Sequence, residues 1–520
     1  VNSPLMNLNS KGLWIGAASV LLAVAGGIWF FGGSDKLPAY IPDDAGLVMR
    51  FDPKELIRGM DMEKIGKNSG LKDLEEKLED EDAMLMKLLM KGFRNPEKTG
   101  IRWSKSFYVF ARSEKGKEYV AVMLPVKDQE VLKTFVDREL PGDAKIKFRD
   151  DMAYVQAGYR EAWGWNNDVL MVVFMDGRRH TDLIQDHLNK TYDACMDKKP
   201  EFKKIIGKTA DIAMYVNTKT SFFKEMMREA GRGMTKGLAG QNFVYAGAYF
   251  NFDQGEMNME GMNLDADGKK VAVDYMKEGA LPEKIIGTPD GKAPLFHLAM
   301  NIEWMPMMKA IAGSMPDEEI PAEMMDILKE VDNGICIQAS ATRLPMTADT
   351  TWTDWGYPMV RKPNPIGVTI RIPVKANTPK LDTALSQGGQ AGISQATSIF
   401  WSKQFSVSRP PGMLRMLMDQ EESGTLKAWK DDRLPDDFAS KPVQIWVDLS
   451  PKNNPLLNGE SDALGRGTEK VADALGKFSH IVGWTDKDES VVRIVLKDKE
   501  EHFLSALFEM IGDLNEDANI

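Results

Sequence analysis

Histidine is the side chain best suited to acid–base chemistry near neutral pH, and this sequence contains only five. They are His180, His187, His297, His480 and His502. A zinc-protease helix needs two histidines four residues apart with a glutamate between them, and no such pair occurs. His180 and His187 are seven residues apart, so on a helix they would share a face with Asp182 and Asp186. We expect a solvated helix there rather than a metal site, and an ordinary packed or half-exposed histidine at His297.

Three further segments resemble ligand-binding motifs only in part. The carboxylate run at 74–82 has leucines at helical spacing, which predicts the solvated face of an amphipathic helix. Asp265, Asp267 and Gly268 resemble the opening of a calcium loop, but the glycine comes too early and no glutamate closes the loop, so we expect a turn. The glycine-rich segment 231–237 follows a helix and lacks the strand that precedes a phosphate-binding loop. The sequence therefore predicts no catalytic, cofactor-binding or metal-binding residues.

Sulfur chemistry is limited to two cysteines, Cys195 and Cys336. They could form one disulfide in an oxidising compartment or remain thiols, and the sequence leaves both alternatives open. Their spacing excludes a cysteine zinc site.

Methionine is unusually frequent, with 33 residues concentrated at 84–90, 226–234, 305–325 and 413–418, mostly in segments that we predict as helices. Methionine adapts to irregular surroundings, so it is typical of adaptable core packing or of a groove that accepts a lipid or a peptide. The long Trp- and Pro-rich loop at 352–358 is a second candidate contact surface.

The net charge of −11 and the absence of a dense basic run argue against a nucleic-acid-binding protein.

Residues 12–33 contain no charged side chain and are long enough to cross the roughly 30 Å hydrocarbon layer of a membrane as a helix. Trp14 lies near one end, and Trp29, Phe30 and Phe31 lie near the other, as in the aromatic belts of a membrane anchor. Lys11 precedes the segment and acidic residues follow it, which predicts a cytoplasmic N-terminus and an exported body. A cleaved signal peptide and a buried soluble helix are the alternatives.

The rest of the chain repeats one pattern four times. Strands are predicted at 45–52, 211–217, 295–301 and 443–448, and each ends on an Asp or Asn that can cap a following helix. A predicted hairpin and a second helix follow each of them, the helices beginning near 128, 269, 378 and 499. We interpret this as tandem duplication of a two-unit half.

The expected fold is therefore α+β: an N-terminal transmembrane helix, then duplicated modules of mainly antiparallel sheet covered by helices on one face. The expected domains are a cytoplasmic tail at 1–11, the anchor at 12–33, and two exported halves at 34–288 and 289–520.

Three segments carry a resemblance to a known family. Ile41-Pro42-Asp43-Asp44-Ala45 precedes the first strand, a Gly-x-x-Ala-Asp-Ile strand starts at Gly207, and 492–498 forms the last strand. With these motifs the exported body resembles, over nearly its whole length, an uncharacterised bacterial envelope family known only as a domain of unknown function. The resemblance implies an envelope location and no activity. Many members are similar to lipoproteins, and the lack of an N-terminal cysteine here departs from them.

We expect a membrane-attached, periplasmic or extracellular protein that binds a protein, peptide or lipid partner, or serves as a scaffold, without being an enzyme. The alternative is an exported hydrolase whose site forms between the two halves.

Overall fold

The computed structural model describes residues 36–56, 58, 84–114, 117–140, 144–157, 161–175, 180–190, 194–224, 243–313, 322–341, 349–352, 358–361, 366–386, 406–418, 425–450, 454, 473–486 and 488–516. The chain divides into two compact units. Unit 1 comprises residues 1–230, 243–270 and 501–520, and unit 2 comprises residues 231–242 and 271–500. The predicted boundary between halves at 288/289 stays a prediction.

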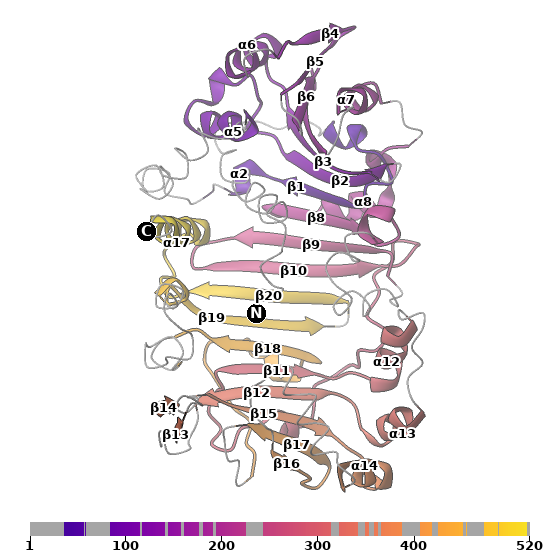
Figure 1. The fold of residues 1–520 in the computed structure, drawn as a ribbon, viewed down its shortest axis with the longest axis vertical. Helices are drawn as coiled ribbons and strands as arrows, with labels where there is room; N and C mark the ends of the chain where they lie inside the picture. The colour runs from indigo at the N-terminus through magenta and orange to yellow at the C-terminus, as the bar shows by residue number, and fades with distance from the viewer. Residues whose placement is uncertain are drawn as a thin grey trace. The chain divides into compact units, whose positions relative to one another are not determined.

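Unit 1 contains an antiparallel sheet whose strand order is β4-β5-β6-β7-β3-β2-β1-β8-β9-β10 (Figure 1). The strands are β1 (Leu47–Phe51), β2 (Phe107–Glu114), β3 (Lys117–Pro125), β4 (Lys147–Arg149), β5 (Met152–Gln156), β6 (Glu161–Trp165), β7 (Val169–Met175), β8 (Ile212–Asn217), β9 (Tyr245–Phe252) and β10 (Glu256–Leu264). The central strands β2, β3 and β7 are almost continuously apolar, as expected for strands that are buried on both faces.

Helices cover both faces of this sheet. On one face, α5 (Met84–Arg94), α6 (Gln129–Glu139) and α17 (Phe503–Glu516) contribute to a core with Phe107 and Val109 of β2. On the other face, α7 (His180–Leu188) and α8 (Pro200–Ile206) pack against the alternate residues Tyr108 and Phe110. Side chains alternate between the faces of a strand, so β2 supplies both cores.

The C-terminal helix α17 completes unit 1 although residues 271–500 of unit 2 separate it from the rest of unit 1 in the chain. Leu504 lies in the first core, and the Phe503 ring lies 6.2 Å from that of Phe252 on β9. The backbone N–H of Gly255 donates to the carbonyl of Glu501, and that of Phe503 donates to the carbonyl of Asp253. The residues that lead into α17 are therefore hydrogen-bonded to the β9–β10 turn at two positions.

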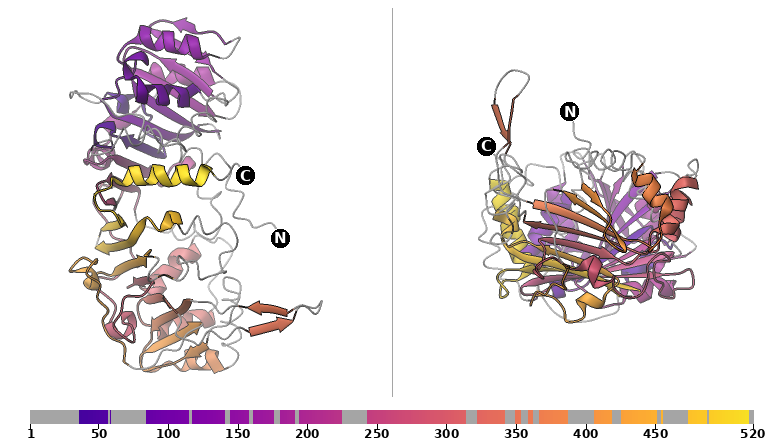
Figure 2. Two further views of the ribbon diagram at one scale, coloured as in Figure 1. Left: turned by 90° about the vertical axis from the view of Figure 1, so that its left-hand side faces the viewer. Right: turned by 90° about the horizontal axis from the view of Figure 1, so that it is seen from below.

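The strands of unit 2 are also antiparallel and pair in the order β16-β17-β15-β12-β11-β18-β19-β20 (Figure 1). Its strands are β11 (Phe296–Met300), β12 (Ile335–Ala341), β15 (Ile366–Pro373), β16 (Ser406–Ser408), β17 (Met413–Met418), β18 (Val443–Asp448), β19 (Phe478–Asp486) and β20 (Glu489–Leu496). A hairpin of β13 (Asp349–Trp352) and β14 (Pro358–Arg361) projects from it (Figure 2).

The helices that the structure describes in unit 2 are short. They include α11 (Glu283–Ile286), α12 (Trp304–Gly313), α13 (Ala322–Glu330), α14 (Pro379–Ala384) and the 3₁₀ helix η6 (Phe438–Ser440). Strands β11 and β12 bury alternate residues only, so the two faces of this sheet differ in exposure.

The four repeated strands are confirmed as β1, β8, β11 and β18. Asp52, Asn217 and Asp448 each accept, through Oδ1, the backbone N–H two residues further on. Of these, only Asp52 directly precedes a described helix, and the helical turn after Asn217 is capped by Thr220, which accepts from the Phe223 N–H. Asn301 differs, because its amide donates to the carbonyls of Glu278 and Gly279 instead. It therefore anchors the preceding loop to β11.

The predicted α+β fold with an N-terminal transmembrane helix is wrong. The described chain is dominated by antiparallel sheet, and the helices expected after the strands are often a single turn, such as α2 (Pro53–Leu56) and α11. No helix forms at 269, where a turn and irregular chain continue to α11, and unit 1 has helices on both faces rather than one. Gly287 directly follows α11, and glycine is a common residue at the end of a helix.

Among the residues that the structure describes, no helix is long and apolar enough to cross a membrane. The predicted anchor at 12–33, with Trp14, Trp29, Phe30 and Phe31, lies outside the described residues.

Candidate functional site

A fully buried polar network crosses the sheet of unit 2 at His297. Its Nδ1 accepts from Gln338 Nε2 at 3.1 Å, and its Nε2 lies 3.2 Å from Gln444 Oε1. The Gln444 amide donates to the carbonyls of Ala439 and Lys441, so its oxygen is left to accept from His297. The imidazole is therefore neutral with its proton on Nε2, and burial lowers its pKa to about 4.

The Cys336 thiol lies beside the same histidine, with its Sγ 3.9 Å from Nδ1. Cysteine, histidine and a side-chain amide form the nucleophilic centre of one class of hydrolase. Here the Nδ1 lone pair already accepts from Gln338, so Nδ1 is poorly placed to take a thiol proton. Cys336 and His297 are both 0% exposed, and the Trp429 ring closes over the imidazole at 5.2 Å between ring centres. We therefore assign His297 and Cys336 a structural role. They lie side by side because of the register in which β11 pairs with β12 and β18.

Arg371 on β15 extends this network to the chain that covers it. Its guanidinium donates to Gln338 Oε1 at 2.7 Å and to the carbonyls of Ile285 and Gly287 at 3.0 and 3.1 Å. Ile285 lies in α11, and Gly287 directly follows this helix. One face of the sheet in unit 2 is thereby covered by α11 and, around Trp429 and Phe438, by a second apolar cluster.

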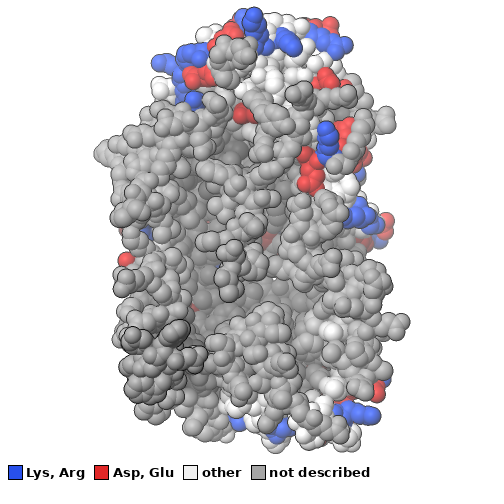
Figure 3. Space-filling model, in the orientation of Figure 1, with Lys and Arg blue, Asp and Glu red and all other residues white. Residues whose placement is uncertain are grey.

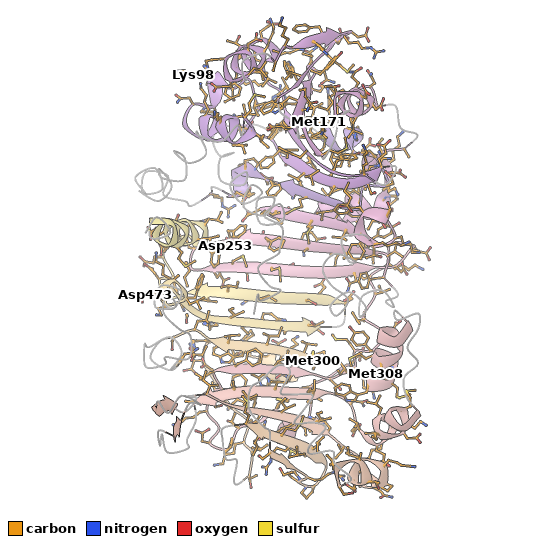
Figure 4. All side chains as sticks on the ribbon, in the orientation of Figure 1. Lys98, Met171, Asp253, Met300, Met308 and Asp473 are labelled. Atoms are coloured by element: carbon orange, nitrogen blue, oxygen red, sulfur yellow. The ribbon has the colours of Figure 1, made fainter. Side chains whose placement is uncertain are left out.

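The opposite face of this sheet carries a continuous set of apolar side chains. Cross-strand register places Leu298 of β11 beside Ile337 of β12 and Ile445 of β18, and the same alternation extends the set to β15, β19 and β20. We name this set the apolar face; its members are Phe296, Leu298, Met300, Ile335, Ile337, Ala339, Ile370, Ile445, Val447, Ile481, Val492 and Ile494. All of them remain partly exposed. Figure 4 labels Met300 at the end of β11.

Part of the apolar face is packed: Ile337, Ala339 and Ile370 lie against a buried cluster of Val368, Met416 and Met418. Ile327 of α13 and Leu381 of α14 form a cluster with Ile372 and Leu414, at the β15–β17 side. Near the turn of the β19–β20 hairpin, this face also carries two hydroxyls, those of Thr485 and Ser490, whose oxygens are 3.1 Å apart. An apolar surface of this extent is typical of a binding surface for an apolar partner.

The histidines predicted on a solvated helix are buried instead. His180 and His187 do share one face of α7, but that face points into unit 1, whereas Asp182 and Asp186 are exposed. His187 Nε2 accepts from the Tyr119 hydroxyl at 2.9 Å, and its Nδ1 faces the carbonyl of Tyr40 at 3.3 Å. Burial lowers the pKa of His187 to about 3, so it is neutral with its proton on Nδ1. These hydrogen bonds link Tyr40, in the segment before β1, through His187 of α7 to Tyr119 of β3.

We expect Tyr119→Phe to lower the free energy of unfolding of the protein by about 1–3 kcal/mol, because the buried His187 Nε2 loses its donor. Denaturant unfolding followed by fluorescence measures the change. Tyr154→Phe, at a half-buried tyrosine of β5, is the control and should change stability by less than about 0.5 kcal/mol. Equal effects of the two substitutions would contradict the assignment.

The remaining predicted features have mixed outcomes. Asp265, Asp267 and Gly268 form the predicted turn, in which Asp265 Oδ1 accepts from two backbone N–H groups. Within the described residues no group of three histidine, cysteine or carboxylate side chains could hold a metal ion. Cys195 and Cys336 form no disulfide, and burial together with Asp197 raises the pKa of the Cys195 thiol.

The methionine segments are only partly helical. Residues 413–418 form β17 rather than a helix, while 305–325 contribute to α12 and α13. The carboxylate run at 74–82, the methionine segment 226–234, the glycine-rich segment 231–237, and Trp355 and Tyr357 of the loop lie outside the described residues. On the face shown in Figure 3, the described basic and acidic side chains are intermingled.

Comparison with protein families bears on unit 1. Residues 39–279 match the family model "Domain of unknown function (DUF4836)". The match confirms the resemblance to an uncharacterised family, over a shorter range than the nearly complete body that the sequence motifs indicated. The matched range includes the ten described strands of unit 1 and excludes α17.

No curated protein matches this chain. The solved structures that it matches include crystal forms III and I of TP0453, each 11% identical and covering 46% of this chain and 82% of that one, with a TM-score of 0.28. Crystal form IV of TP0453 is 10% identical, with coverage of 43% and 79% and the same TM-score. A likeness at this score carries no functional argument.

Proposed function

We propose that this protein is a non-enzymatic binding protein of the cell envelope, and that the apolar face of unit 2 is its binding surface. The observation that supports the proposal is the contrast between the two faces of one sheet. On one face, α11, Trp429 and the hydrogen-bonded network around His297 cover the sheet. On the other face, twelve apolar side chains are partly exposed. Exposed apolar surface is costly in water, and an apolar partner removes that cost.

The hydrolase alternative receives no support from the described residues. The described residues that come closest to a nucleophile and a base are Cys336 and His297. Both are buried, and Nδ1 of His297 accepts a hydrogen bond from Gln338. The matched family model supplies no activity that would favour it.

Site-specific photo-crosslinking in intact cells tests the binding surface. A benzophenone amino acid at Leu298, on the apolar face, should capture a discrete partner. The same label at Phe148 is the control, because Phe148 is a large apolar side chain of unit 1 that is 62% exposed. Identical products at both positions, or none at Leu298, would overturn the proposal.

The location of the body is a separate proposal. We propose that the protein is associated with the cell membrane and that its body lies outside the cytoplasm, because an uncharged N-terminal segment preceded by a lysine and followed by acidic residues is typical of exported proteins. Protease added to cells with a permeable outer envelope and an intact inner membrane should digest the body while cytoplasmic markers survive. Recovery of the full-length chain in the soluble cytosol contradicts the proposal.

A further inference from the structure

A buried carboxyl lies at the start of α5 in unit 1. Glu161 begins β6 and points to the same face as Trp163, because the two residues are two positions apart on one strand. Its Oε1 accepts from the Trp163 indole at 2.5 Å, and the backbone N–H of Leu85 donates to the same carboxyl. Leu85 is the second residue of α5, so this N–H has no partner within the helix. Glu161 therefore joins the first turn of α5 to the sheet.

The two halves of α5 are held differently. In its C-terminal half, Lys91 pairs with Glu139 of α6 at 3.9 Å, at the surface of the unit. In its N-terminal half, Met84 and Leu85 are buried in the core that contains Trp163, and Glu161 supplies a polar contact from below. A change in the charge of Glu161 therefore acts on the first turns of α5, while the pairing with α6 is left in place.

No cation compensates the charge that Glu161 acquires when it ionises. The charged or titratable groups on the neighbouring elements are Lys87 of α5, Glu118 of β3 and His180 of α7, and within the described residues none of them pairs with Glu161. The two hydrogen bonds and the N-terminus of α5 favour the carboxylate. At 9% exposure the loss of water costs more, and it raises the pKa of Glu161 to about 7. Movement of the first turns of α5 away from the sheet readmits water to the carboxylate.

We propose that Glu161 is a pH-dependent latch for α5: the protonated carboxyl holds the first turns of this helix on the sheet, and the ionised carboxyl releases them. Release uncovers Met84, Leu85 and the Trp163 ring, so the open state of unit 1 presents an apolar surface that the closed state lacks. This inference goes beyond the proposed function, because it concerns unit 1 and does not involve the apolar face of unit 2.

The direction of the effect follows from proton linkage. The closed state binds the proton more tightly than the open state, in which a hydrated carboxyl returns to its ordinary pKa of 4.5. Opening therefore increases as pH rises from 4.5 to 7, and it levels off above that range. If the carboxyl becomes fully hydrated on opening, the opening constant rises about 70-fold between pH 5 and pH 8, and partial hydration gives a smaller rise.

Hydrogen–deuterium exchange of the full-length protein at pH 5, 6, 7 and 8 tests the latch, with each rate divided by the intrinsic rate of an unprotected amide at that pH. We expect the opening constant of the first turns of α5, residues 85–89, to rise by about tenfold or more from pH 5 to pH 8. These amides should also be less protected than those of α6 at every pH, because the latch opens without the rest of the unit. An opening constant that does not change with pH, or equal protection of α5 and α6 throughout, overturns the inference.

Oxidation of methionine by hydrogen peroxide gives a second readout in the wild-type protein. Met84 is 3% exposed when α5 is closed, so its oxidation rate, relative to free methionine at the same pH, should rise between pH 5 and pH 8. Met171 is 0% exposed in the other core of unit 1 and is the internal reference, which should stay slower than Met84 at pH 8. Equal rates at the two positions, or no rise at Met84, contradict the latch.

A matched pair of variants assigns the pH dependence to one carboxyl. Glu161→Gln keeps an acceptor for both donors but cannot ionise, so its α5 opening constant should vary by no more than about twofold between pH 5 and pH 8. Glu97→Gln replaces an exposed glutamate of the same unit and should keep the wild-type profile. A wild-type pH profile in the Glu161→Gln protein overturns the assignment.

Discussion

Replacing Glu161 by glutamine should stabilise the protein at alkaline pH and weaken its pH dependence. Glu161 begins β6 and is only 9% exposed, and burial raises the pKa of its carboxyl from about 4.5 to about 7. Hydrogen bonds from the Trp163 indole and the Leu85 backbone favour the charged form but do not offset burial. The folded protein therefore binds a proton that the unfolded chain releases between pH 4.5 and 7. Stability falls as pH rises through this window, by about 3 kcal/mol in total.

The measurement is the free energy of unfolding in denaturant at pH 5 and pH 8. At pH 8, Glu161→Gln should exceed wild type by roughly 1–3 kcal/mol, because the amide accepts from Trp163 without a buried charge. At pH 5 this advantage should disappear. Glu97→Gln, at an exposed glutamate of the same unit, is the control and should shift stability by less than about 0.5 kcal/mol at both pH values. A wild-type stability that rises from pH 5 to pH 8, together with an unchanged Glu161→Gln profile, contradicts this assignment.

Replacing Arg371 by methionine should destabilise unit 2 by about 3 kcal/mol. Methionine fills a similar volume but donates no hydrogen bond, so the carbonyls of Ile285 and Gly287 and the Gln338 amide oxygen each lose a buried donor. Each such loss costs about 1–3 kcal/mol, and relief of the buried charge offsets part of the sum. The segment around α11 should then detach from the sheet more often.

Two readouts test this prediction. Denaturant unfolding should show the lower stability, and trypsin should cleave at Lys284 and Lys292, which flank the released carbonyls, at lower concentrations than in wild type. Arg415→Met is the matched control, because Arg415 pairs with Arg371 in register but is half-buried and donates to the Ser408 hydroxyl. If the Arg371 and Arg415 variants are equally resistant to trypsin, the proposed role of Arg371 is wrong.

Strands and turns were predictable from the sequence where neighbouring residues determine them. Alternation and turn residues located the four repeated strands and their hairpins, and the Asx turns that end the strands follow from single residues such as Asn217. Pairing between distant strands was not predictable in this way. Gln444 reaches His297 only because β18 pairs with β11, and no local signal in the sequence specifies that register.

The apolar face was missed for a related reason. Leu298, Ile337 and Ile445 each belong to a strand with ordinary alternation, and only the cross-strand register makes them neighbours. The methionine clusters left core packing and a binding groove open, and none of them includes Met300, the single methionine of the apolar face. Burial of His187 was likewise unpredictable, since the apolar positions of α7 are few and the burying residues, Tyr40 and Tyr119, lie far away in the chain.

The position of α17 in unit 1 has a consequence for biosynthesis. A ribosome that has finished Lys270 must still add about 230 residues before Glu501, which takes on the order of 10–50 s at roughly 5–20 residues per second. During this interval the nascent first unit lacks Leu504 and the helix that carries it, so part of its core faces solvent. A chaperone that shields this surface until chain termination would prevent aggregation of the unfinished protein.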